Sequence, residues 1–336
     1  MKAVVLEKIG GVENLIFKDV PNPTPNENEV VVKIFASALN HRDVWIRLGK
    51  YMGIKVPIIL GSDGAGVVYE VGKNVDKNLI GKEVLIDPAS NWGDDEKVQS
   101  ENYKILGLPD DGTNAELVKV SAKNIFPKPN YLNFEEAAAL ALCATTAYRA
   151  VKTRANIKSN ENILITGIGG GVAIAALQIA VATNANVFVT SSSENKIQKA
   201  KSLGAIGGAL YTNEKWKEEL FNLTNKKGFD VVIDGAGGKM FDDAIEILKP
   251  SGRYVIYGAT LGVAKEIQVR RIFWKQISIF GTTMGSPKEF VEAINFFEKN
   301  KIKPVIDSVY DLSQTQLAHK KMEEGLQFGK IVLKVG

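Results

Sequence analysis

Apolar runs of strand length alternate with amphipathic, helix-like segments along the second half of the chain. The run Ile163–Ile165 leads into a glycine-rich turn, and an apolar helical pattern follows from Val172 to about Ala182. Further strand-like runs follow at the spacing of strand–helix units. They are Asn186–Thr190, Ala209–Thr212, Asp230–Asp234, Arg253–Tyr257 and Ile277–Gly281. This alternation predicts an α/β fold with a doubly wound parallel sheet.

The turn between the first of these strands and its helix carries Gly167, Gly169, Gly170 and Gly171. Glycines let backbone N–H groups approach a phosphate closely, and the N-terminus of the following helix adds partial positive charge. Strand, glycine turn and helix together predict a binding site for the pyrophosphate of a dinucleotide. The alternative is a structural glycine turn in another kind of α/β protein.

The first part of the chain predicts a different, β-rich domain. Its short runs of valine and isoleucine are separated by glycine, proline and asparagine. They are Lys2–Leu6, Glu29–Ala36, Gly64–Val71, Glu83–Ile86 and Ala115–Val120. A helix is predicted to begin at Phe134 and to include the alanine- and leucine-rich segment Glu135–Leu142, with Asn133 as its N-cap.

The tail of the chain has a helical pattern from Pro287 to about Asn300 and a strand pattern at Lys330–Val335. One helix and one strand cannot bury a core, so we expect the tail to return to the first domain. We therefore place the β-rich domain at residues 1–121 and 284–336, and the nucleotide-binding domain at residues 122–283.

Composition narrows the classes of protein. The 336 residues suit two domains, and no apolar run approaches the roughly 20 residues that cross a bilayer. The net charge of +4 comes from scattered basic residues, which argues against nucleic acid as a partner. Cys143 is the single cysteine, which excludes internal disulfides and multi-cysteine zinc sites and favours a cytoplasmic location.

Segments spread over the whole length carry a resemblance to a known family. They are the opening MKAVVLEKIGG, ALNHRDVWIRLGKY (Ala38–Tyr51), LGSDGAGVVYEVG (Leu60–Gly72), ATTAYRAV (Ala144–Val151), DVVIDGAGG (Asp230–Gly238) and FGKIVLKV (Phe328–Val335). With these segments the chain resembles the medium-chain dehydrogenase/reductase superfamily. The resemblance implies a GroES-like catalytic domain and a Rossmann NADP-binding domain with a cleft between them.

Three positions depart from the zinc-dependent alcohol dehydrogenases of this superfamily. The resemblance places Asn40 at their cysteine ligand, Ser62 at their histidine ligand and Leu142 near their third ligand. None of these side chains is a thiolate, imidazole or carboxylate, the ligands that zinc prefers. The stretch that would hold a four-cysteine structural zinc, within Asn91–Gly107, has no cysteine. Both zinc sites are therefore predicted to be absent. The alternative is a substitute site built from His41, Asp63 and Cys143.

Because it lacks these ligands, the chain resembles the zinc-independent quinone oxidoreductase and enoyl reductase branches, which reduce with NADPH. Those branches have asparagine at the position of Asn40 and a Gly-x-Tyr motif like Gly49-Lys50-Tyr51. Tyr51 is the predicted proton donor or carbonyl polariser, because a phenol keeps its proton at neutral pH. Asn40 is predicted to orient the substrate or the nicotinamide ribose. Packing of Tyr51 and a turn role for Asn40 are the alternatives.

The end of the second strand of the nucleotide-binding domain favours NADPH over NADH. NAD-specific sites place a carboxylate there for the ribose 2′-OH, whereas this strand ends in serines and Glu194 follows later. By the resemblance, Ser192 and Lys196 stand where relatives hold the 2′-phosphate, and Tyr211 is placed to join them. Taken alone, Lys196 is typical of a solvated helix charge.

The resemblance implies further contacts with the cofactor. They are expected from Asn40, Thr146, Gly170, Gly171, Val172, Gly235, Tyr257, Gly258, Phe280, Gly281, Thr282 and Lys330. At each glycine the alternative is a purely structural turn.

Together these observations predict an NADPH-dependent, zinc-independent oxidoreductase that transfers hydride to a quinone or a related α,β-unsaturated carbonyl. A conjugated acceptor delocalises the developing negative charge, which a metal would otherwise stabilise. The alternatives are an enoyl thioester reductase, a zinc-type alcohol dehydrogenase-like protein and a non-catalytic NADPH-binding protein. The predicted partners are a small-molecule substrate and a second copy of the chain, paired through Ile277–Thr283 into a homodimer, with no nucleic acid and no membrane.

Overall fold

The computed structural model describes residues 1–335 and separates them into two compact units. Unit 1 contains Met1–Leu142 and the described residues from Ser286 onward, and unit 2 contains Cys143–Gly285. Residues 122–142 thus belong to unit 1, although the sequence analysis assigned them to the nucleotide-binding domain. The physical reason is packing: helix α2 (Phe134–Ala138) lies on strands of unit 1, and the ring of Phe134 stacks on Phe35 at 4.7 Å.

Unit 2 is built on a six-stranded parallel sheet in the order β13-β12-β11-β14-β15-β16. The strands are β11 (Asn162–Ile165), β12 (Asn186–Ser191), β13 (Gly207–Leu210), β14 (Phe229–Asp234), β15 (Leu248–Ile256) and β16 (Ser278–Gly281). Within unit 2 the chain first forms β11 at the centre of the sheet and then adds β12 and β13 on one side of it. It then returns to the centre and adds β14, β15 and β16 on the other side. The order reverses between β11 and β14, where open α/β sheets bind ligands. The predicted doubly wound parallel sheet is confirmed.

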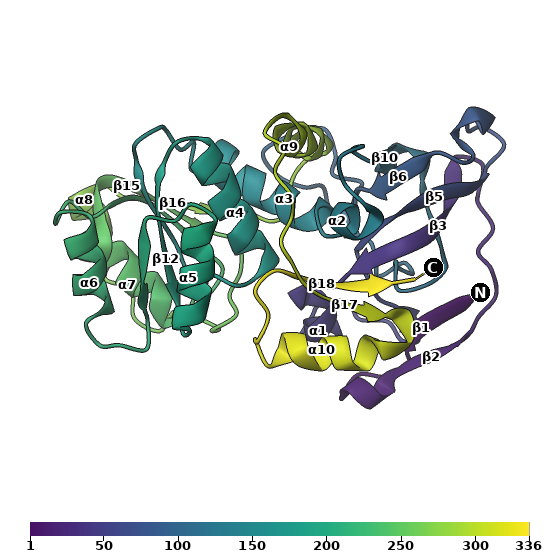
Figure 1. Ribbon diagram of the computed structural model, residues 1–336, viewed down its shortest axis with the longest axis horizontal. Coiled ribbons are helices and arrows are strands. Elements are labelled where there is room, and N and C mark those ends of the chain that lie inside the picture. The colour runs from purple at the N-terminus through teal and green to yellow at the C-terminus, as the bar shows by residue number, and fades with distance from the viewer. Residues whose placement is uncertain (336) are drawn as a thin grey trace. The chain divides into compact units, whose positions relative to one another are not determined.

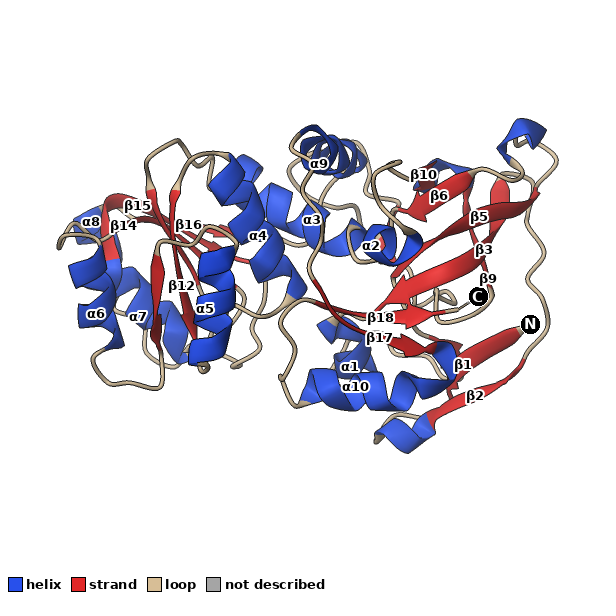
Figure 2. Cartoon of the chain, in the orientation of Figure 1, coloured by secondary structure: helices blue, strands red, loops and turns tan. Residues whose placement is uncertain are grey.

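Helices cover both sides of this sheet, as Figure 2 shows. They are α4 (Gly171–Ala182), α5 (Glu194–Ser202), α6 (Trp216–Leu223), α7 (Lys239–Ile247) and α8 (Val269–Lys275), preceded by α3 (Ala141–Tyr148) and the π-helical segment Arg149–Arg154. Because both faces are covered, the central strands are largely apolar, and Ile163, Leu164 and Ile165 have no exposed surface. The rings of Phe188 and Phe229 meet edge to face at 5.5 Å within this core.

Several predicted elements have different bounds in the structure; β15, for example, begins at Leu248 and not at Arg253. Two of the differences have a plain physical reason. The strand predicted at Ala209–Thr212 runs from Gly207 to Leu210, because its pairing with β12 includes two glycines that no apolar pattern reveals. The helix predicted to begin at Phe134 does begin there, with Asn133 as its N-cap, but the segment to Leu142 holds two helices: α2 ends at Ala138 and α3 begins at Ala141. An alanine-rich segment carries no stop signal for the tight turn between them.

Unit 1 consists of mostly antiparallel sheets. The main sheet has the order β10-β6-β5-β3-β18-β17 with β9 also on β3, a second sheet has the order β2-β1-β4, and β7 pairs with β8. The strands are β1 (Lys2–Leu6), β2 (Leu15–Asp19), β3 (Glu29–Ala38), β4 (Ile58–Ile59), β5 (Asp63–Val71), β6 (Glu83–Ile86), β7 (Ala89–Ser90), β8 (Lys104–Ile105), β9 (Leu117–Ser121), β10 (Ile125–Pro127), β17 (Ile306–Asp311) and β18 (Lys330–Lys334). Figure 1 shows the tail strand β18 beside β3, so the tail returns to the first domain as expected.

The other helices of unit 1 are α1 (His41–Arg47), α9 (Pro287–Lys299) and α10 (Thr315–Glu323). Helix α9 begins at a capping box, in which the Glu289 carboxylate accepts the N–H of Ser286 at 2.8 Å. Helices α1 and α10 lie side by side (Figure 1). Within residues 1–335, no helix has both the length and the apolar character that crossing a membrane requires.

Helix α10 buries a histidine beside a buried arginine. His319 has no exposed surface, and neither ring nitrogen has a hydrogen-bond partner among residues 1–335. Arg47 of α1 is 1% exposed and donates to the carbonyl of Gly10 at 2.6 Å and to the carboxylate of Glu323 at 2.5 Å. Burial lowers the pKa of His319 to about 3, and the charge of Arg47 acts in the same direction. The imidazole is therefore neutral in the folded protein.

This neutral histidine predicts a pH dependence of stability. An unfolded histidine titrates near about pH 6.5, so below that pH the unfolded state binds the extra proton and stability falls as the pH falls toward 3. Between pH 8 and pH 5 the wild type should lose about 2 kcal/mol more unfolding free energy than the His319→Leu variant. Urea denaturation of both proteins at both pH values measures this. All other titrating groups are shared, so an equal loss in the two proteins would contradict a neutral His319.

Candidate functional site

The glycine turn of unit 2 lies at the carboxyl end of β11, at the point where the strand order reverses. Gly167 has a φ of +60° and Gly169 a φ of +147°, conformations that favour glycine. The turn is tied to the neighbouring strand, because the N–H of Gly167 donates to Thr190 Oγ1 at 3.1 Å and the N–H of Ile168 to the Thr190 carbonyl at 2.8 Å. The N-cap of the 12-residue helix α4 is Gly170, which offers no side-chain cap, so the first N–H groups of α4 suit an anion.

A buried carboxylate, Asp234, joins three strand ends beside this turn. Its oxygens accept the hydroxyl of Thr166 at the end of β11, the hydroxyl of Tyr254 on β15, and the N–H groups of Ala236 and Gly237 at 2.9 Å. Burial raises the pKa of Tyr254, and the charge of Asp234 adds to that rise, so the phenol stays a donor. Asp234 thereby fixes the geometry of the reversal point. The sequence analysis did not identify it, although a carboxylate at the end of an apolar strand was a usable signal.

The residues predicted to select NADPH lie at the ends of β12 and β13. Ser192 is exposed, Lys196 is half-buried in the first turn of α5, and Tyr211 is 38% exposed directly after β13. The N–H of Tyr211 donates to the carbonyl of Ser191 at 3.0 Å, which brings the two strand ends together. The carboxylate of Glu194 is hydrogen-bonded by Gln198 of the same helix at 2.6 Å.

The ends of β14, β15 and β16 bring most of the remaining predicted cofactor residues to the same edge, because the strands are parallel. They are Gly235, Tyr257, Gly258, Phe280, Gly281 and Thr282. A side chain at Gly235 would collide with the ring of Tyr257, whose atoms lie 2.6 Å from the position of a Cβ. Thr282 Oγ1 is buried and has no hydrogen-bond partner among residues 1–335, as expected of a group that serves a ligand.

Thr146 is the predicted cofactor residue of unit 2 that precedes the first strand of the sheet. It lies on α3, is 5% exposed and directs its hydroxyl toward Met284 Sδ at 3.7 Å. The strand ends, the uncapped helix α4 and the unpartnered hydroxyl of Thr282 together fit the pyrophosphate and ribose of a dinucleotide.

Unit 1 contains a buried polar cluster that the sequence analysis did not assemble. The ammonium of Lys330 lies 2.8 Å from Asp63 Oδ2 and 2.6 Å from Asn40 Oδ1. Asn40 Nδ2 donates to the same Asp63 oxygen at 3.0 Å, and the other oxygen of Asp63 accepts the N–H of Leu142 at 2.9 Å. Asp63 has no exposed surface, and Lys330 and Asn40 are 3% and 7% exposed. Lys330, expected at the cofactor, is thus engaged inside unit 1, and its contact with a cofactor stays a prediction.

The residues that replace the zinc ligands do not fit a metal ion. Asn40 and the N–H of Leu142 are bonded to Asp63, and the hydroxyl of Ser62 accepts from Arg42 Nη1 at 2.6 Å and donates to the Leu106 carbonyl at 2.8 Å. A lysine ammonium, which donates only, points into this cluster. Within residues 1–335, no three His, Cys, Asp or Glu side chains are grouped as metal ligands, which leaves the substitute set of His41, Asp63 and Cys143 without support.

Tyr51 lies in the turn after α1 and is 38% exposed. The guanidinium of Arg42 lies over its ring at 5.3 Å from the ring centre, a cation–π contact that orients the phenol. The carboxylate of Asp43, on the same helix, accepts the N–H of Asn40 at 2.8 Å. Burial raises the pKa of Asp43, and the charge of Arg42 opposes that rise.

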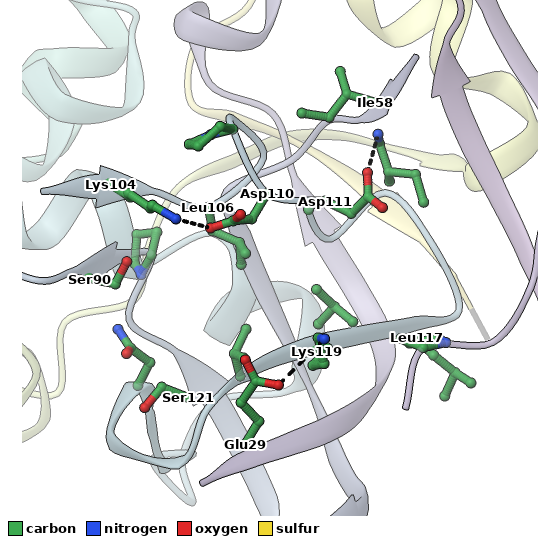
Figure 3. Close-up of a pocket in the computed structure, with 18 of the residues that line it drawn as sticks. Glu29, Ile58, Ser90, Lys104, Leu106, Asp110, Asp111, Leu117, Lys119 and Ser121 are labelled. Carbon is green, nitrogen blue, oxygen red and sulfur yellow. Dashed lines mark hydrogen bonds and ion pairs between the residues drawn. The ribbon is translucent and has the colours of Figure 1, made fainter. Parts of the chain in front are cut away.

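Unit 1 also has an open groove of about 1040 Å³, which contains none of the predicted site residues. Four of its charged side chains form two ion pairs, as Figure 3 shows: Lys104 with Asp110 at 3.2 Å and Lys119 with Glu29 at 3.5 Å. Asp87 lies on its wall, and burial raises the pKa of this carboxyl to about 7. The groove is therefore a solvated surface feature of unit 1, and it shares no lining residue with the cluster of Lys330, Asp63 and Asn40.

Comparisons with known proteins cover both units. A model described as an alcohol dehydrogenase GroES-like domain matches residues 26–130, and one described as a zinc-binding dehydrogenase matches residues 171–299. These matches agree with the predicted GroES-like and Rossmann domains.

Individual relatives match over nearly the full length. A zinc-type alcohol dehydrogenase-like protein of Leptosphaeria maculans is 37% identical over 94% of this chain and 93% of its own. An acryloyl-coenzyme A reductase of Sulfurisphaera tokodaii is 30% identical over 99% of this chain and 100% of its own. The crystal structure of an NAD-dependent alcohol dehydrogenase, 39% identical, superposes with a TM-score of 0.95 over 100% of both chains.

Proposed function

Because the chain belongs to the medium-chain dehydrogenase/reductase superfamily, we propose that it is an NADPH-dependent, metal-independent reductase of α,β-unsaturated carbonyl compounds. The observation that carries this proposal is the ammonium of Lys330 between Asp63 and Asn40. It lies among residues that replace the metal ligands of zinc-dependent members. A reductase without zinc ligands at these positions has to stabilise the negative charge that develops on the acceptor with the cations and hydrogen-bond donors of its own chain.

Unit 2 supplies the residues that would hold the cofactor. The uncapped N-terminus of α4 suits the pyrophosphate, and Ser192, Lys196 and Tyr211 suit a 2′-phosphate. When bound, the nicotinamide supplies a hydride. The name of an NAD-dependent relative favours NADH, but β12 ends without a carboxylate, and the nearby Glu194 is hydrogen-bonded to Gln198. We therefore retain NADPH.

A conjugated carbonyl is the acceptor that suits this site best. Hydride addition to its β-carbon places the negative charge on an enolate, which hydrogen-bond donors stabilise without a metal. The name of the acryloyl-coenzyme A reductase relative points to an enoyl thioester. A quinone has the same electronic character and remains a second candidate acceptor. An aldehyde or alcohol substrate, as the name of the zinc-type relative suggests, has no conjugated system to delocalise the charge, and a metal ion commonly polarises its oxygen.

The first prediction of this proposal concerns cofactor and acceptor together. NADPH oxidation should be fastest with an enoyl thioester, an enone or a quinone and slowest with a simple aldehyde, and NADH should support slower turnover than NADPH. Absorbance of the reduced nicotinamide measures every rate. Faster turnover with NADH would contradict the cofactor assignment, and turnover of the aldehyde alone would contradict the acceptor class. Tight NADPH binding without any turnover would instead indicate a non-catalytic NADPH-binding protein.

The second prediction concerns Tyr51, the proposed proton donor. The Tyr51→Phe variant keeps the ring over Arg42 but loses the hydroxyl. Its kcat should fall several-fold while its affinity for NADPH is unchanged, because the phenol acts on the substrate and not on the cofactor. Stopped-flow rates and NADPH fluorescence titrations measure the two quantities. An unchanged kcat would remove Tyr51 from the catalytic residues.

We also propose that the protein is a homodimer paired through the edge strand β16. Ile279 on this strand is 41% exposed, and Phe273 and Trp274 of the neighbouring helix α8 are 64% and 78% exposed. An unpaired edge beside exposed aromatic side chains is typical of a contact surface. Ile279→Lys should convert the dimer to a monomer in sedimentation experiments, whereas a monomeric wild type would contradict the proposal.

A cytoplasmic location is part of the same proposal. The single cysteine, Cys143, is 5% exposed, and buried free thiols are typical of proteins in reducing compartments. Fractionation of cells that produce the protein tests this.

A further inference from the structure

The cluster of Lys330, Asp63 and Asn40 is assembled by strand register. Strand β18 pairs antiparallel with β3, with Val332 opposite Ala38, and the N–H of Leu39 donates to the Ile331 carbonyl at 2.9 Å. On the other side of β3, Ala38 is the partner of Asp63, the first residue of β5. The first residues of β18 and β5 therefore meet directly after the end of β3, where Asn40 begins the next helix.

Each polar atom of the Asn40 side chain faces a group that can act only as a hydrogen-bond donor or only as an acceptor. Its carbonyl oxygen accepts from the ammonium of Lys330, which can only donate, and its nitrogen donates to the carboxylate of Asp63, which accepts. A flipped amide would set donor against donor and acceptor against acceptor. The lysine and the aspartate thus allow one orientation of this amide and exclude the other.

Stability alone does not explain this arrangement. Removing two charges from water costs so much that a buried ion pair adds little net stability over well-packed apolar residues. The pair is nevertheless complete, because both oxygens of Asp63 are hydrogen-bonded and the ammonium has at least two partners. A satisfied, buried and rigid ion pair is what a positioned electrostatic group requires.

We propose that Lys330 and Asp63 are positioning residues that fix the amide of Asn40, and that the Lys330 ammonium is the fixed positive charge of this site in place of a metal ion. This inference rests on the proposed function. It differs from the expectation that Lys330 contacts the ribose or phosphate of the cofactor. It also accounts for Asp63, to which the proposed function gives no other role.

Three variants and one matched control test the inference. Lys330→Met removes the charge, Asp63→Asn removes its counter-charge, and the double variant removes both while it keeps similar volumes. The control is Lys128→Met, because Lys128 is a 9% exposed lysine of the same unit that pairs with Glu83 at 3.1 Å and donates to the Leu132 carbonyl at 2.6 Å.

Turnover of the best acceptor and the dissociation constant of NADPH are measured for each protein. Lys330→Met and the double variant should lose about 10- to 100-fold in kcat, as expected when a group at the reaction centre loses its fixed position. Their NADPH dissociation constants and the kcat of Lys128→Met should stay at the wild-type values. A double variant with wild-type kcat would overturn the inference, because the pair would then be purely structural. Weakened NADPH binding with an unchanged kcat would also overturn it and assign Lys330 to the cofactor.

Thermal midpoints of the same proteins give a readout that needs no activity. Each single variant leaves an unpaired buried group, so the double variant should melt above at least one of them. Additive losses would overturn the inference, because the two residues would then not act as a pair. If the wild type reduces no acceptor with NADPH, the proposed function fails, and the midpoints still decide whether Lys330 and Asp63 are coupled.

Discussion

Asp63 is the group on which the organisation of unit 1 around Asn40 depends. One buried carboxylate accepts hydrogen bonds from a lysine ammonium of β18, from the amide of Asn40 at the N-cap of α1 and from the backbone N–H of Leu142. Burying a carboxylate is unfavourable unless each lone pair is matched, and here the neighbouring elements supply the donors. The requirement to satisfy Asp63 therefore holds β5, β18, the junction between β3 and α1, and the start of α3 in one arrangement. The same requirement orients Asn40.

A comparable constraint acts in unit 2, at the point where the strand order of its sheet reverses. Asp234 collects two hydroxyl and two N–H donors from three strand ends, and this leaves the glycine turn and the first N–H groups of α4 oriented for a ligand. In both units a buried acidic residue at a strand end sets the local geometry. In the proposed function, unit 2 would hold the dinucleotide, and unit 1 carries the charged and polar groups proposed to act on the acceptor.

The sequence predicted those features that depend on local pattern. Apolar periodicity located the strands of the parallel sheet, and the motif after Ile165 located the glycine-rich turn between β11 and α4. The sequence did not predict the features that depend on strand register. Lys330 and Asp63 are far apart in sequence, and they meet only because of how β18 and β5 align with β3, where a slip by one residue would turn each side chain to the other face. The resemblance to a family placed Lys330 at the cofactor, whereas in the structure its ammonium pairs with the buried carboxylate of Asp63. Helix α10 was missed because its sequence, TQLAHKKME, has few apolar positions and buries a neutral histidine among them.

The central claim is that a lysine ammonium, paired with Asp63, occupies the place that a metal ion has in zinc-dependent members of the superfamily. The most direct test is the metal content of the purified protein, measured by mass spectrometry together with NADPH turnover before and after treatment with a strong chelator. We expect no stoichiometric zinc and the same turnover in both samples. One zinc ion per chain, with turnover that is lost on chelation and restored by zinc, would contradict the account.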